Sequence, residues 1–284
     1  MKKHERRLKA ALDEVLAQYH GQEFLKTDPI CIPHAYEGSL NQEFSGFIAA
    51  MFAFGNVRSM LPAIHRAIGW LGREPVQSLL EATERDMVTA AKGFNYRWVR
   101  AADLVSILRT LRSVYQDGGS LEQLYRGSGA SCEGTKDDGL SRMLDGLHAA
   151  CPGGALASYG TRYMLPSSGG KGAYKRVHLF LRWMVRSDEI DLGVWKGVHP
   201  RQLVMPLDTH VSRISRLLGL SDRKTADARM AHEITERLRV FDPEDPVKYD
   251  FALARLGIIG ACPSKRVASA CAPCSLKPSC RYWR

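Results

Sequence analysis

The sequence of 284 residues predicts an all-α protein. Apolar residues recur at the spacing of one helix face in several places, and no run of alternating apolar and polar residues competes with them. Short Gly- and Pro-rich stretches separate the helical segments, as expected for loops. The length suits one large domain or two small lobes, either of which can bury a core.

Five segments carry the helical pattern, in chain order. The first stripe comprises Leu8, Leu12, Val15, Leu16 and Tyr19, and the second comprises Leu104, Ile107, Leu108, Leu111 and Tyr115. The third comprises Val211, Ile214, Leu217 and Leu218, the fourth Ile234, Leu238 and Phe241, and an apolar helical segment follows at Tyr249–Ile259. We expect breaks at residues 27–33, 118–119, 127–136, 166–172, 199–206 and 242–246.

The charge favours a polyanionic partner. Lys and Arg number 40 against 30 Asp and Glu, which gives a formal net charge of +10. A solvated basic surface explains the same excess equally well. The first residues are too polar for a signal peptide, and no apolar run is long enough to span a membrane. We therefore expect a cytoplasmic protein without membrane contact.

Four of the seven cysteines crowd into the last residues of the sequence. Cys262, Cys271, Cys274 and Cys280 follow the spacing Cys-x8-Cys-x2-Cys-x5-Cys. Four thiolates in so short a segment can surround one metal centre, because short loops cost little closure entropy. An odd cysteine count without an export signal argues against disulfides. The scattered Cys31, Cys132 and Cys151 are expected to be small buried residues.

The spacing favours a [4Fe–4S] cluster over zinc. Zinc ribbons usually use two Cys-x2-Cys pairs, and here only Cys271 and Cys274 have that spacing. Zinc remains the alternative cofactor. The first loop of the quartet holds Lys265 and Arg266, which suit contacts with DNA phosphates or are solvated surface charges.

The cysteine loop resembles that of the endonuclease III-type DNA glycosylases, in the helix-hairpin-helix superfamily, although its first gap is two residues longer. A second stretch, Pro206-Leu-Asp-Thr-His-Val-Ser-Arg-Ile, resembles the V-D-T-H-V-x-R motif of the same superfamily. The resemblance implies that Asp208 is the catalytic carboxylate at the start of a helix, a position that also suits an ordinary N-cap. His210 and Arg213 are interpreted as positioning the helix or facing phosphates.

A third stretch, residues 165–177, resembles the family's L-P-G-V-G-R-K hairpin. Its Gly-rich turn before a helix predicts an anion site, formed by Ser168, Gly169, Gly170, Lys171 and Gly172. The family's nucleophilic lysine corresponds to Lys175 by the helix that follows, or to Lys171 by the preceding Leu-Pro. We favour Lys175, although a plain surface lysine remains the alternative. Asp208 follows it by a longer interval than is usual, as in the archaeal-type 8-oxoguanine glycosylases.

The segment Phe47–Arg58 resembles the family helix that ends in a wedge-bearing loop. The resemblance implies that Asn56 fills the gap left by a flipped base and that Arg58 contacts a phosphate. A capped helix end at Asn56 is the alternative.

Together these matches imply two helical lobes with a helix-hairpin-helix motif and a C-terminal [4Fe–4S] loop. We expect residues 38–190 to form a helical barrel and residues 1–37 with 191–284 to form the cluster domain. The implied function is a monomeric, nucleoid-associated DNA glycosylase with AP lyase activity. Its partner would be double-stranded DNA containing a damaged base, oxidised like 8-oxoguanine. The alternatives are a monofunctional glycosylase, an AP-site lyase, or a non-catalytic nucleic-acid-binding protein with a structural cluster.

Overall fold

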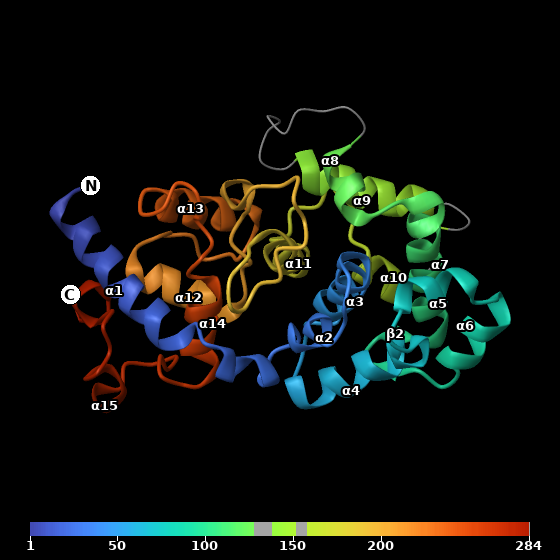
Figure 1. Ribbon diagram of the computed structural model, residues 1–284. Coiled ribbons are helices and arrows are strands. Elements are labelled where there is room, and N and C mark those ends of the chain that lie inside the picture. The colour runs from blue at the N-terminus through green and yellow to red at the C-terminus, as the bar shows by residue number, and fades with distance from the viewer. Residues whose placement is uncertain (128–137, 152–157, 284) are drawn as a thin grey trace.

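The computed structural model describes residues 1–127, 138–151 and 158–283 (Figure 1). Helices hold 62% of the residues and strands 3%, which confirms the all-α class. The helices of the N-terminal half are α1 (Lys3–Tyr19), α2 (Cys31–His34), α3 (Ser39–Met51), α4 (Val57–Ile68), α5 (Pro75–Glu81), α6 (Glu84–Ala91), α7 (Ala101–Tyr115) and α8 (Leu121–Arg126). The later helices are α9 (Asp138–Ala150), α10 (Tyr159–Met164), α11 (Lys175–Val185), α12 (Thr209–Leu218), α13 (Ala228–Arg239), α14 (Asp250–Ile258) and α15 (Ala268–Cys271).

Short 3₁₀ turns link several of these helices: η1 (Gln22–Thr27), η2 (Gly69–Leu71), η3 (Gln116–Gly118), η4 (Pro200–Gln202) and η5 (Lys277–Ser279). Each predicted apolar stripe falls on a helix, so the periodicity located these elements correctly. The fourth stripe runs past its helix, because α13 ends at Arg239 and Phe241 lies beyond it. Most of the predicted break at 127–136, and Cys132 with it, lies outside the described residues.

Buried side chains form two separate apolar clusters. The larger is built mainly from α2 to α11 and the loop up to Leu203. The smaller joins Leu8, Leu12 and Val15 of α1 to α12, α13, α14 and Leu276. Figure 1 shows α1 lying beside α12 and α14, with both chain ends in the same half of the molecule. The first helix therefore completes a lobe whose other helices come from the end of the chain.

One pair of short strands was not expected from the sequence. β1 (Asn95–Tyr96) pairs antiparallel with β2 (Val99–Arg100). Arg97 adopts a left-handed backbone with φ +54°, which lets the chain reverse within two residues. Strands this short carry no detectable alternation, so periodicity could not predict them.

The loop between α11 and α12 is packed into the molecule by its side chains. Trp195 donates from its indole to the buried Glu43 carboxylate at 2.6 Å. The same carboxylate accepts the backbone N–H of Leu121 at 2.8 Å, at the start of α8. The additional residues between Lys175 and Asp208 are thus anchored to α3. Within the described ranges, no helix combines the length and apolar character needed to cross a membrane.

Candidate DNA-repair site and cysteine centre

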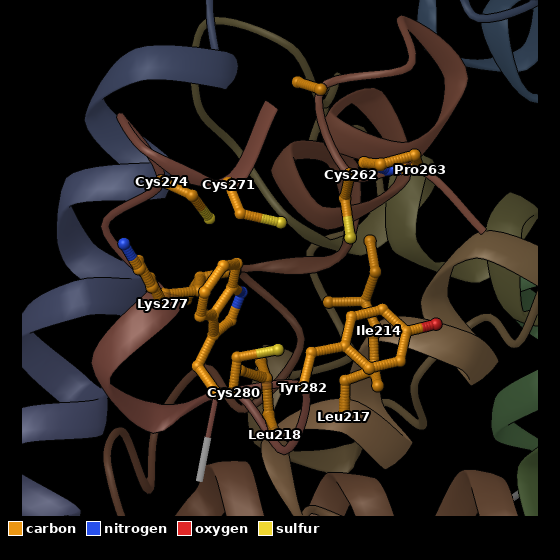
Figure 2. Close-up of a pocket in the computed structure, with 13 residues that line it drawn as sticks. Ile214, Leu217, Leu218, Cys262, Pro263, Cys271, Cys274, Lys277, Cys280 and Tyr282 are labelled. Atoms are coloured by element: carbon orange, nitrogen blue, oxygen red, sulfur yellow. The ribbon is translucent and has the colours of Figure 1, made fainter. Parts of the chain in front are cut away.

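The four C-terminal cysteines line one pocket. Cys262, Cys271, Cys274 and Cys280 surround a cavity of about 410 Å³, its opening included. Figure 2 shows their sulfur atoms facing the same space between α12 and the end of the chain. The rest of the wall is mainly apolar and comprises Ile214, Leu217, Leu218 and Leu276, with Lys277 and Tyr282 at the edge. Folding thus brings together the whole predicted ligand set.

Backbone hydrogen bonds hold both ends of this segment against the helices. The Cys262 N–H donates to Leu256 O at 2.9 Å, so the segment begins directly at the end of α14. The Arg281 N–H donates to Leu217 O at 2.8 Å, which attaches the far end to α12. The cysteine pocket is therefore built on α12 and α14.

Arg213 connects α12 to the first cysteine. Its guanidinium donates through Nη1 to Cys262 Sγ at 3.3 Å and to Pro263 O at 2.8 Å. Its Nη2 donates to Cys262 O at 2.6 Å. The arginine of the Asp-Thr-His segment thus contacts the cysteine loop, and the prediction that it positions the helix or faces a phosphate stays untested.

The donor set and the shape of the pocket suit a multi-iron cluster. Four thiols with apolar surroundings match the ligands of a [4Fe–4S] centre. A single tetrahedral zinc needs its sulfurs about 2.3 Å from one point. Among the described residues, no three His, Cys, Asp or Glu side chains are gathered closely enough to hold one metal ion. The four cysteines line one pocket, and the choice between a [4Fe–4S] cluster and zinc stays a prediction.

The predicted hairpin lies between α10 and α11. Gly169 and Gly172 have no neighbour within 4 Å of an added Cβ, so their backbones face open space. Within the described part of the chain, the N–H groups of Gly169 and Gly170 donate to no backbone carbonyl. Lys171 is exposed, and its carbonyl accepts the Ala228 N–H at 3.5 Å. The hairpin therefore presents free backbone donors and rests on the start of α13.

Tyr174 organises the hairpin from within. Its hydroxyl lies 2.7, 2.9 and 3.0 Å from the carbonyl oxygens of Ser167, Ser168 and Gly170. Tyr174 also has a left-handed backbone with φ +44°, which is unusual for a bulky residue. The Ser168 hydroxyl donates to Asp145 at 2.7 Å on α9. The turn is thus held in shape before any ligand arrives.

Lys175 is the first residue of α11 and lines an open cleft of about 990 Å³, solvent at its mouth included. Its Nζ is half-buried and donates to Ala53 O at 3.2 Å, just beyond the end of α3. The cleft wall also includes Phe54, Tyr163 and Arg176. The guanidinium of Arg176 lies 4.0 Å from the centroid of the Tyr163 ring, and burial lowers the pKa of Arg176 to about 10. Lys175 therefore occupies a cationic cleft with aromatic walls.

Asp208 caps α12. Its carboxylate accepts the Val211 N–H at 2.6 Å, which confirms the N-cap alternative and leaves catalysis untested. Asp208 is not among the residues that line the Lys175 cleft. His210 packs against Gly257 of α14, where an added Cβ would meet its ring at 2.5 Å. The two proposed catalytic residues thus begin two helices, one in each lobe.

The remaining predicted DNA contacts lie at the surface. Asn56 caps α4 by accepting the Arg58 N–H at 2.8 Å, and both side chains are exposed. Lys265 is exposed in the cysteine loop, and Arg266 stacks at 3.9 Å on the ring of Trp283. Arg266 is therefore partly occupied by an aromatic contact, which the sequence gave no reason to expect.

Sequence reasoning missed the contributions of Tyr174 and Arg176. Both lie inside the stretch 165–177 that resembles the family hairpin, but their roles depend on distances across the hairpin and the cleft. The signal available was their position beside Lys175 in a Gly-rich stretch. Of the scattered cysteines, Cys151 is buried as predicted and Cys31 is half-buried.

Comparison with protein families finds one match. The family described as "Protein of unknown function (DUF2400)" matches residues 28–259, which is most of the chain. No curated protein and no solved structure matches the sequence. The matched region includes the hairpin, Lys175 and Asp208 but ends before the four cysteines. The chain therefore belongs to the DUF2400 family.

Proposed function

We propose that the protein is a base-excision DNA glycosylase with AP lyase activity, which acts as a monomer on duplex DNA. The substrate class we favour is a damaged, oxidised base similar to 8-oxoguanine. One observation carries the proposal. An exposed Gly-rich hairpin with unused N–H donors leads directly into a helix whose first residue, Lys175, lines an open cationic cleft. Phosphates bind backbone N–H groups in such turns, so DNA held there would lie beside the lysine.

The proposed architecture is the two-lobed helix-hairpin-helix arrangement. Residues 38–190 would form the barrel domain, and residues 1–37 with 191–284 the cluster domain. Two separate apolar clusters support this division. The proposed division assigns Ile30, Trp195 and Leu203 to the cluster domain, but these residues pack in the larger apolar cluster. The proposed boundaries therefore cut through packed segments.

The chemistry begins when the hairpin grips the backbone and the damaged nucleotide leaves the stack. The unprotonated Lys175 amine attacks C1′ of the sugar. The glycosidic bond breaks, and its electron pair leaves with the base, which takes up a proton. The Asp208 carboxylate stabilises the positive charge that develops on the sugar. The C1′–O4′ bond of the sugar ring then breaks, O4′ takes up a proton and the nitrogen loses one, which leaves a Schiff base between Lys175 and C1′. Loss of a proton from C2′ breaks the C3′–O bond, and hydrolysis of the Schiff base frees the lysine.

The four cysteines would hold a [4Fe–4S] cluster, with zinc as the alternative. Such a cluster would cross-link the segment that follows α14, at Cys262, to the end of the chain at Cys280. Arg213 joins that cross-link to the helix that Asp208 begins. The exposed Lys265 and Arg266 would contact phosphates from the same loop.

Borohydride trapping on a panel of duplexes tests the proposal. The panel contains 8-oxoguanine, an oxidised pyrimidine, uracil and an abasic site. We expect a covalent adduct with the wild type and with Lys171→Ala, and none with Lys175→Ala. An adduct that survives Lys175→Ala contradicts the assignment of the nucleophile. Base release without any adduct indicates a monofunctional glycosylase, and an adduct with abasic DNA alone indicates a lyase.

A non-catalytic nucleic-acid-binding protein is the alternative from another class. It predicts tight duplex binding, no product from any duplex of the panel, and no effect of Asp208→Asn. Those three results together would replace the enzymatic proposal.

A further inference from the structure

A buried ion-pair network joins α11 to the second lobe. Arg182, two turns after Lys175, donates through Nη1 to Asp250 Oδ2 at 2.5 Å. Its Nε donates to Asp191 at 3.1 Å. The side chain of Arg182 is 3% exposed, that of Asp250 4% and that of Asp191 0%, so water does not screen these contacts.

Arg186, the residue just after the end of α11, makes a second link in the same direction. It forms ion pairs with Asp245 at 2.8 Å and Asp188 at 2.8 Å, and donates to Asp191 as well. Asp245 lies in the loop just before α14, and Asp250 is the first residue of α14. The helix that begins with Lys175 is therefore fixed to the start of α14 at two points.

α14 also packs against α12, the helix that Asp208 caps, and the His210 ring of α12 lies against Gly257 of α14. Burial raises the pKa of Asp250 to about 6, the Arg182 cation lowers it, and the Asp208 charge raises it further. The charge of Asp191, in the loop after α11, also raises the pKa of Asp250. The charge of Asp28 raises the pKa of Arg182. Asp28 also forms an ion pair with Arg255 of α14 at 2.6 Å. Arg182 is thus the cation that compensates a buried carboxylate on the helix against which α12 packs.

Stability alone is a weak reason for such a network. Apolar side chains of similar volume often stabilise a buried site as well as an ion pair does. What the pairs supply is a fixed geometry, because each carboxylate must meet its guanidinium within hydrogen-bond distance. Here that geometry fixes α11, which begins with Lys175, to α14, which packs against the α12 helix that Asp208 caps.

We propose that Arg182 is a positioning residue that sets the spacing between Lys175 and Asp208 through its pair with Asp250. This inference rests on the proposed function. Arg182 touches no substrate, and it acts through α11 on one side and α14 on the other. Small displacements of reacting groups lower rates strongly while leaving binding intact, so the effect should fall on the chemical step.

The test uses single-turnover base release at saturating enzyme, with duplex affinity measured separately. Arg182→Met leaves Asp250 buried without its cation, so a double variant, Arg182→Met with Asp250→Leu, removes both charges of this pair, and Arg186 remains as the cation beside Asp191. We expect the double variant to bind duplex DNA as the wild type does and to react at least about tenfold more slowly. Arg182→Lys keeps the cation and should recover part of the rate. Arg109→Met is the matched control, because its partner Glu84 is exposed and lies outside the network.

In the single variant Arg182→Met, loss of the cation should raise the pKa of Asp250 further, so the limb of the pH–rate profile that this carboxyl sets should move to higher pH. A merely structural role would lower thermal stability and leave the rate per folded, DNA-bound molecule unchanged. That result, with an unmoved pH profile, overturns the inference while the proposed function stands. A wild type inactive on every lesion overturns the proposed function itself.

Discussion

Arg213 donates a hydrogen bond to the sulfur of Cys262 at 3.3 Å, and two more to the backbone beside it. Arg213 lies on α12, five positions after Asp208, which caps the start of that helix. The cysteine loop and the cap are therefore attached to one rigid element. These hydrogen bonds attach the C-terminal cysteine loop to the helix that Asp208 caps.

Arg213→Met should therefore lower thermal stability. Hydrogen bonds to a charged group contribute about 1.5–3 kcal/mol each, of which we expect a net loss of about 2 kcal/mol. For a chain of this size the melting temperature should fall by about 4–8 °C. Arg216→Met, an exposed position on the same helix, is the control and should change little. Equal melting temperatures for the two variants would argue against the link.

Replacing a single cysteine of the quartet should remove the metal centre. We expect iron and acid-labile sulfide in the purified wild type, and loss of both in Cys271→Ser. Cys31→Ser, outside the pocket, should retain them. Because α12 is attached to this segment, chelation of the metal should also lower the melting temperature. Zinc in place of iron and sulfide would contradict the cluster and leave the proposal for Lys175 and Asp208 unaffected.

Asp208→Asn separates capping from catalysis. Asparagine caps helices about as well as aspartate, so the free energy of unfolding should stay within about 0.5 kcal/mol of the wild-type value. Base release should fall by at least about a hundredfold, because the neutral amide cannot stabilise positive charge on the sugar. Asp227→Asn is the control, since Asp227 caps α13 by accepting the Met230 N–H at 2.9 Å. If both variants keep the full single-turnover rate, Asp208 is only a cap.

Tyr174→Phe should weaken DNA binding without abolishing folding. The change removes the hydroxyl that lies among three hairpin carbonyls, so the turn loses its internal support. We expect about a threefold to tenfold loss of duplex affinity, equivalent to one neutral hydrogen bond of about 1 kcal/mol. Fluorescence anisotropy with undamaged duplex measures it. Tyr159→Phe, at a largely exposed ring, should bind normally.

Asp250 should make stability fall as pH rises from about 4 to 6. Its pKa in the folded protein is raised from 3.8 to about 6, so the native state holds a proton that the unfolded chain has lost. The corresponding loss is at most about 3 kcal/mol and is complete above the folded pKa. The stability of Asp250→Asn relative to the wild type should therefore increase over this window. The neighbouring Asp188 has its pKa lowered below 3.8, so it acts only at more acidic pH.

The sequence predicted the helices well because burial on one face imposes a period that can be read directly. The sequence also identified the four cysteines as one group, because residues close in sequence lie close in space whatever the rest of the fold. The Arg182 and Arg186 network could not be predicted, because its carboxylates come from three segments joined only by packing. Tyr174 was missed for a similar reason, as its role depends on a left-handed backbone at the end of the hairpin. Asp208 was placed correctly as a helix start, whereas its relation to Lys175 depends on how the lobes meet.

The pairing of α1 with helices from the opposite end of the chain has a consequence for folding during synthesis. Leu8, Leu12 and Val15 bury their side chains against α14 and its neighbours. Those partners leave the ribosome only after the whole larger lobe has been made. The apolar face of α1 therefore stays unprotected for most of translation, which makes it a natural binding site for a chaperone.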